Sequence, residues 1–73
     1  MNADDVHASC NALDEEDLRL LALVAAGLPA PAVAHRLNTS PRTLQRRIRD
    51  VRDRIGVQTT IEAVAWAARR QLI

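Results

Sequence analysis

The 73-residue sequence is poor in the residue types that cross-link small domains or build sheets. It has one cysteine, one tryptophan and no phenylalanine, tyrosine or lysine. The lone Cys10 excludes a disulfide within the chain. Few aromatic residues together with abundant alanine, leucine and arginine favour helices over sheets. We therefore predict a single all-α domain in a reducing cytoplasm.

Several functional classes are excluded by what the sequence lacks. It has no apolar run near the roughly 18 residues that span a bilayer, and no signal-peptide pattern. His7 and Cys10 lie three residues apart, but no second pair of metal ligands accompanies them. There is also no nucleophile–base pair and no glycine-rich phosphate loop. We expect no membrane, metal, cofactor or small-molecule ligand for this chain, and no enzymatic activity.

The formal net charge of +1 conceals two charged segments of opposite sign. Residues 1–17 carry six acidic residues and no arginine or lysine, whereas residues 36–54 carry seven arginines against two aspartates. A basic cluster of this kind indicates an anionic partner. The alternative is a solvated face with ion pairs one helical turn apart, such as Arg46–Asp50 and Arg49–Asp53.

The basic cluster coincides with the strongest helix signal in the chain, residues 41–55. Ser40 is a suitable N-cap, Pro41 suits the first helical position, and Gly56 suits the left-handed residue after a helix. Four apolar residues form one stripe along it: Leu44, Ile48, Val51 and Ile55. On the opposite side lie Arg42, Arg46 and Arg49. One face is therefore predicted to pack on a core and the other to contact an anion.

Three further helices are expected around this one. The first covers about residues 14–26, with Asp14 as its cap, and the second about residues 30–37. The fourth covers about residues 60–71, with Thr59 and Glu62 forming a capping box. Residues 1–12 show no apolar period and are predicted to be a flexible tail or linker remnant. The domain is thus residues 13–73.

The spacing in the fourth helix predicts which side faces inward. The expected inward stripe is Ile61, Val64, Ala65, Ala68 and Leu72. The expected outer side, with a tryptophan among small residues, indicates a partner surface composed of Ala63, Trp66, Ala67 and Arg70. The alternative, in which the Trp66 ring lies over the edge of the core, stays open.

From Leu13 to the C-terminus the chain resembles the LuxR/FixJ-type helix-turn-helix domain of bacterial transcription regulators. The matching positions run through all four helices without a gap: Leu13, Leu20-Leu21, Val24-Ala25, Gly27-Leu28, Val33-Ala34, Leu37, Ser40, Thr43-Leu44, Val51, Arg54-Ile55-Gly56-Val57, Glu62-Ala63-Val64 and Leu72-Ile73. It departs from the usual pattern at Gln45, at Arg47, at residues 29–32 (Pro-Ala-Pro-Ala), at Glu16-Asp17, at Thr60 and at Gln71.

The resemblance implies sequence-specific binding of double-stranded DNA, with the third helix in the major groove and a homodimer formed through the fourth. It implies base contacts from Gln45, Arg46 and Arg49. It implies contacts to the DNA backbone from Arg42, Thr43, Arg47, Arg54 and Gln58. RNA polymerase is a further partner that it allows. The chain would be a stand-alone transcriptional regulator or an excised effector domain.

Two other functions stay open at this point. A sigma-factor-like promoter-reading domain shares the helix-turn-helix pattern, although such a domain usually ends soon after its recognition helix. The arginine face could instead bind an acidic protein partner in a protein-interaction helical module. No pattern in this sequence identifies the operator, the controlling signal, or the choice between activation and repression.

Overall fold

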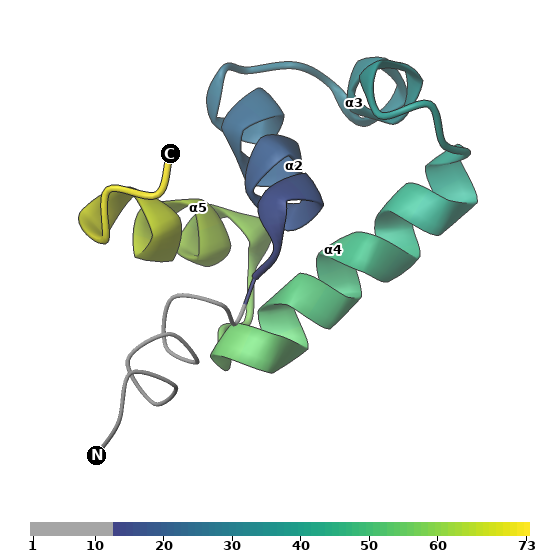
Figure 1. The fold of residues 1–73 in the computed structure, drawn as a ribbon. Helices are drawn as coiled ribbons and strands as arrows, with labels where there is room; N and C mark the ends of the chain where they lie inside the picture. The colour runs from purple at the N-terminus through teal and green to yellow at the C-terminus, as the bar shows by residue number, and fades with distance from the viewer. Residues whose placement is uncertain (1–12) are drawn as a thin grey trace.

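The computed structural model describes residues 13–73, which form four α-helices and no strand (Figure 1). They are α2 (Glu15–Ala25), α3 (Ala30–Arg36), α4 (Pro41–Ile55) and α5 (Thr60–Arg69). The predicted all-α domain with four helices is confirmed, and only the ends of α2, α3 and α5 differ, by one or two residues, from those expected. The expected N-terminal tail and the His7–Cys10 pair lie outside the described residues.

Local capping determines where the helices begin. At α2 the Asp17 N–H donates to Asp14 Oδ1 at 2.9 Å and the Asp14 N–H donates to Asp17 Oδ2 at 3.2 Å, which completes a capping box. At α4 the Thr43 N–H donates to Ser40 Oγ at 3.1 Å, and Pro41 occupies the first turn. These bonds satisfy backbone donors that have no partner inside a helix. The caps predicted from the sequence are confirmed.

Helix α4 ends as its sequence predicts. Gly56 adopts φ +73°, in the left-handed region that glycine enters without a steric penalty, and its N–H donates to the Arg52 carbonyl at 2.8 Å. The chain then turns toward α5, which Thr59 caps by accepting the Glu62 N–H at 3.1 Å. Glu62 Oε1 accepts from the Gln58 N–H and from the Thr59 hydroxyl, not from the Thr59 N–H. The Thr59 cap is therefore confirmed, but the predicted capping box with Glu62 does not form.

The core lies between α4 on one side and α2, α3 and α5 on the other. Its buried residues come from every helix and from the residue before the α2 cap: Leu13, Leu20, Leu21, Val33, Ala34, Leu44, Val51, Ala63 and Ala67. From the predicted stripe of α4, Leu44 and Val51 are fully buried, and Ile48 and Ile55 pack against the core at its edge. The inner face of α4 is therefore the one predicted.

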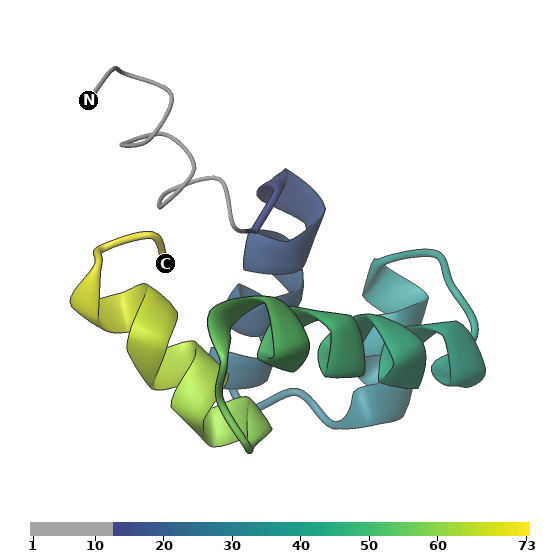
Figure 2. The same cartoon turned by 90° about the horizontal axis from the view of Figure 1, so that it is seen from below.

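The two central helices adopt a helix-turn-helix arrangement. In Figure 1 α3 is seen almost end-on while α4 crosses the view, so the short turn of residues 37–40 joins helices that cross steeply. Figure 2 shows α4 uncovered along its length on the side away from the other helices. Among the described residues no helix is long and apolar enough to cross a membrane.

The predicted faces of α5 are wrong in part: Val64 and Leu72 pack against the core as expected, but four other residues do not lie where the spacing placed them. Ala63 and Ala67, expected on the outside, are 1 % and 0 % exposed, whereas Ile61, expected inside, is 79 % exposed. Ala68, also expected inside, is exposed as well. The small Ala63 and Ala67 side chains instead face the core, where α5 packs against α2 and α4. Ala63 and Ala67 are therefore core residues and cannot form part of a dimer surface.

The Trp66 side chain lies at the boundary between the core and the surface. Its side chain is half-buried and packs against the core. The Arg70 guanidinium carbon lies 4.2 Å from the centre of the ring, in a cation–π contact, and Arg70 Nη1 donates to the Trp66 carbonyl at 3.2 Å. The reading in which the ring covers the edge of the core, left open by the sequence, matches this placement.

Candidate functional site

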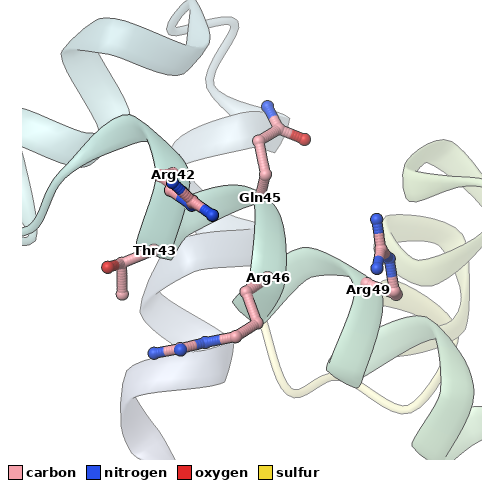
Figure 3. Close-up of a pocket in the computed structure, with 5 residues that line it drawn as sticks. All are labelled: Arg42, Thr43, Gln45, Arg46 and Arg49. Carbon is pink, nitrogen blue, oxygen red and sulfur yellow. The ribbon is translucent and has the colours of Figure 1, made fainter.

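The outer face of α4 bears a shallow cavity of about 430 Å³. Five side chains line it: Arg42, Thr43, Gln45, Arg46 and Arg49. Figure 3 shows all five projecting from one stretch of α4, with no side chain from another helix labelled among them. They span about two helical turns, opposite the buried stripe through Leu44 and Val51. We call these five residues the α4 face.

The six arginines of α4 differ in their ion pairs, and Arg52, which lies off the α4 face, donates instead to the Gln58 carbonyl. Within residues 13–73 two ion pairs occur, Arg47 with Glu16 and Arg54 with Asp17, and both join α4 to the start of α2. The pairs within α4 that would have neutralised the α4 face, Arg46–Asp50 and Arg49–Asp53, do not form. Three guanidinium groups therefore remain on the α4 face with no carboxylate from the described residues within 4.0 Å: Arg42, Arg46 and Arg49.

The Arg47 guanidinium and the Glu16 carboxylate form a bidentate ion pair. Arg47 Nη1 donates to Glu16 Oε1 and Arg47 Nη2 donates to Glu16 Oε2, each at 3.1 Å. These hydrogen bonds raise the pKa of the Arg47 guanidinium above its already high ordinary value. A bidentate geometry of this kind is the strongest that an arginine and a carboxylate adopt. Arg47, predicted to contact the DNA backbone, is thus bound to α2.

Arg54 is held by a more deeply placed carboxylate. Arg54 Nη1 donates to Asp17 Oδ2 at 3.0 Å, and the Asp17 side chain is only 9 % exposed. Burial raises the pKa of Asp17, because desolvation disfavours the charged form and outweighs the hydrogen bond from Asp14 and the nearby guanidinium. The pKa of Asp14 is lowered, mainly because its carboxylate accepts the Asp17 N–H. Arg54 therefore helps to anchor α4 to α2.

The structure brings together five of the eight residues predicted to contact DNA. The three predicted base contacts lie on the α4 face together with Arg42 and Thr43. Thr43 Oγ1 accepts a hydrogen bond from the Ser40 hydroxyl at 3.0 Å, which leaves its own proton to donate outward. Gln58 lies past the end of α4, where its backbone bonds with Glu62 and Arg52. Arg47, Arg54 and Gln58 are thus not part of the cavity lining.

The exposed side of α4 changes sign along the helix. The arginines of the α4 face lie within residues 42–49, and the exposed carboxylates of Asp50 and Asp53 follow on the same side, with Arg52 and Arg54 on the flanks. At 100° per residue Asp53 projects in nearly the same direction as Arg46, two turns earlier. On this side of α4 an anion is thus attracted more strongly to the stretch that carries the α4 face than to the stretch around Asp50 and Asp53.

Sequence reasoning missed both ion pairs between α2 and α4. Their partners are 31 and 37 residues apart, so no helical spacing relates them. The available signal was the acidic run Glu15-Glu16-Asp17, which accounts for helix capping equally well. Among the described residues no group of three or more histidine, cysteine or acidic side chains is placed to hold a metal ion.

No family model, curated protein or solved structure matches this chain. The assignment of a function therefore depends on the fold and on the chemistry of the α4 face.

Proposed function

We propose that this domain is a sequence-specific double-stranded DNA-binding transcriptional regulator of the LuxR/FixJ type, or the effector domain of one, and that α4 enters the major groove. One observation carries the proposal. Three arginines of the α4 face have no carboxylate partner in the described residues, although five acidic side chains lie on α2 or on α4 itself: Glu15, Glu16, Asp17, Asp50 and Asp53. A cluster of exposed guanidinium groups without partners favours an external anion.

The shape of α4 suits the groove. An α-helix with its side chains is about 10–12 Å wide, and the major groove of B-DNA is about 12 Å wide. Helix α4 is uncovered on its basic side, and it is held to the rest of the domain by buried Leu44 and Val51 on the other (Figure 2). It can therefore enter the groove without unfolding any part of the core.

The chemistry of the α4 face suits base reading. Arginine can donate two hydrogen bonds to guanine O6 and N7, and glutamine can form a bidentate pair with adenine N6 and N7. Arg46, Arg49 and Gln45 therefore supply the base contacts in our proposal, and Arg42 and Thr43 contact phosphates beside them. Because Asp50 and Asp53 repel phosphates, the N-terminal half of α4 enters most deeply, as in other helix-turn-helix domains.

We assign dimerisation to the outer side of α5. Ile61 is 79 % exposed, and Ala65 and Ala68 follow it at helical spacing on the side of α5 that faces away from buried Ala63 and Ala67. A second copy packed there by two-fold symmetry would present two α4 faces to two half-sites about one helical turn apart. Sedimentation velocity at several concentrations tests this: Ile61→Asp should shift the population to monomer, whereas the exposed control Gln71→Asp should not.

The test of DNA binding begins with selection of duplexes from a random-sequence pool at physiological salt. An enriched inverted repeat supports the proposal and reports the half-site spacing. Binding without enrichment would leave only non-specific attraction to polyanions. Absence of binding at any salt would assign the arginines to an acidic protein partner instead.

Variants then test the base contacts on the selected duplex and on a scrambled one. Arg46→Ala and Arg49→Ala should each lower affinity for the selected duplex by about 5- to 150-fold, the equivalent of roughly 1–3 kcal/mol, and affect the scrambled duplex less. Arg69→Ala, an exposed arginine on α5, makes the same change of charge and serves as the control. Equal losses on both duplexes for Arg46→Ala would exclude a base contact from that residue.

A further inference from the structure

The ion pair between Glu16 and Arg47 lies at the flank of the α4 face. Arg47 follows Arg46 in the sequence, and its guanidinium meets the Glu16 carboxylate through two hydrogen bonds of 3.1 Å. The pair is open to solvent, with the Arg47 side chain 32 % and the Glu16 side chain 57 % exposed. A phosphate oxygen that approaches α4 on this side would therefore meet an arginine whose strongest donor fork is already occupied.

A phosphodiester and a glutamate carboxylate compete for the same arginine atoms. Both are singly charged anions that present two oxygens to a guanidinium, and both prefer the bidentate arrangement. The Glu16 carboxylate also repels a phosphate that comes close. While the pair persists, Arg47 adds no net positive charge at the flank of the α4 face.

We propose that Glu16 is an intramolecular competitor of the DNA phosphate for Arg47. It lowers by one the number of phosphates that the domain neutralises and thereby weakens the sequence-independent part of binding. This inference rests on the proposed function, but it concerns a residue of α2 that lies outside the DNA-contacting surface. Its consequence is a flatter dependence of affinity on salt, since each neutralised phosphate contributes about 0.9 to the slope of log K against log salt.

Removal of the carboxylate should free Arg47. Glu16→Gln keeps the shape of the side chain and removes its charge, so the slope should become more negative by about 0.9. The gain in affinity over the wild type should then grow by about threefold as salt is lowered from 200 to 50 mM. Arg47→Gln in the Glu16→Gln background should return the slope to the wild-type value.

Glu15→Gln is the matched control. Glu15 is the neighbouring residue in the first turn of α2, is exposed, and forms no ion pair with a described residue. It therefore makes the same change of net charge without releasing an arginine. The slope is measured by fluorescence anisotropy on the selected and scrambled duplexes, and retention on a heparin column is measured for each variant. Far-ultraviolet circular dichroism shows that each variant is folded.

Two results would overturn the inference. One is a slope for Glu16→Gln equal to that of Glu15→Gln. The other is a slope for the single variant Arg47→Gln that is about 0.9 less negative than the wild-type slope. Arg47 would then already contact a phosphate in the presence of Glu16.

The heparin measurement separates this inference from the proposed function. If the domain shows no preference among duplexes but Glu16→Gln elutes from heparin at higher salt than Glu15→Gln, the proposed function fails and the competition by Glu16 stands. If no variant is retained on heparin or binds either duplex even at 50 mM salt, both proposals fail.

Discussion

Two neighbouring substitutions, Ala67→Val and Ala68→Val, test which face of α5 packs against the core. The sequence pattern predicts Ala68 inside and Ala67 outside, whereas the structure has Ala67 at 0 % exposure and Ala68 exposed. Both positions lie within α5, so both substitutions incur the same loss of helix propensity, at most about 0.7 kcal/mol. The difference between the two variants therefore isolates packing.

The expected magnitude follows from the burial of Ala67. Valine adds two methyl groups, and at a fully buried position these must displace neighbours in the core, at a cost of typically about 1–3 kcal/mol. At Ala68 the same groups enter solvent. At about 0.05–0.15 kcal/mol per residue the 61 described residues have a total stability of roughly 3–9 kcal/mol, so a loss of this size is readily measured.

Urea denaturation followed by far-ultraviolet circular dichroism provides the comparison. Ala67→Val should lower the free energy of unfolding by about 1–3 kcal/mol more than Ala68→Val does, with unchanged m-values. In thermal unfolding the difference corresponds to about 4–8 °C for each kcal/mol. Equal losses, or a larger loss for Ala68→Val, would refute the packing of α5 described here. Repetition at two protein concentrations separates folding from any association through the outer side of α5.

Three further predictions concern the ends of helices and the single tryptophan. Asp14→Ser keeps a capping oxygen but removes a carboxylate whose pKa is lowered in the fold. The wild type should therefore exceed this variant in stability by the largest amount above the ordinary aspartate pKa of about 3.9, and the difference should decrease as pH falls through the lower folded pKa. Urea denaturation across that pH range measures the difference. Gly56→Ala should cost about 1–2 kcal/mol in thermal denaturation from backbone strain alone, because φ is +73° and nothing lies within 4 Å of the added carbon; a much larger loss would reveal a clash that the structure lacks. Arg70→Gln should cost about 0.5–1 kcal/mol and change the fluorescence of Trp66, since the guanidinium lies over the ring; an unchanged spectrum would contradict that contact.

Most of the local structure could be predicted because the bonds that determine it lie within a few residues. Asp14 and Asp17, or Ser40 and Thr43, are three positions apart, so their capping bonds follow from the order of residues. The two faces of α4 could be predicted as well. Its apolar and basic residues are sharply separated, and burial of Leu44 and Val51 leaves one orientation for the arginines.

The candidate site could be predicted only in part. Helical spacing identified the three arginines that line the cavity, and the family resemblance added Thr43 and Gln45. Which arginines lack an acidic partner depends on where α2 lies relative to α4. In the sequence alone, helical spacing places Arg46 opposite the apolar stripe and Arg47 on a flank, but it does not show that Arg47 has an acidic partner and Arg46 has none. In the fold, Arg47 turns to Glu16 at the flank and Arg46 lines the cavity on the outer face.

The sequence by itself determined the helices, their caps and the basic face of α4, because these depend on hydrogen bonds and side-chain spacing within one helix. Tertiary structure alone decided the rotation of α5 and the division of the arginines. In α5 the alanines and larger apolar residues are distributed around the helix, so close packing against α2 selects the small Ala63 and Ala67 for the interior. For the arginines, the deciding carboxylates lie more than thirty residues away along the chain, and only folding brings them within 3.1 Å.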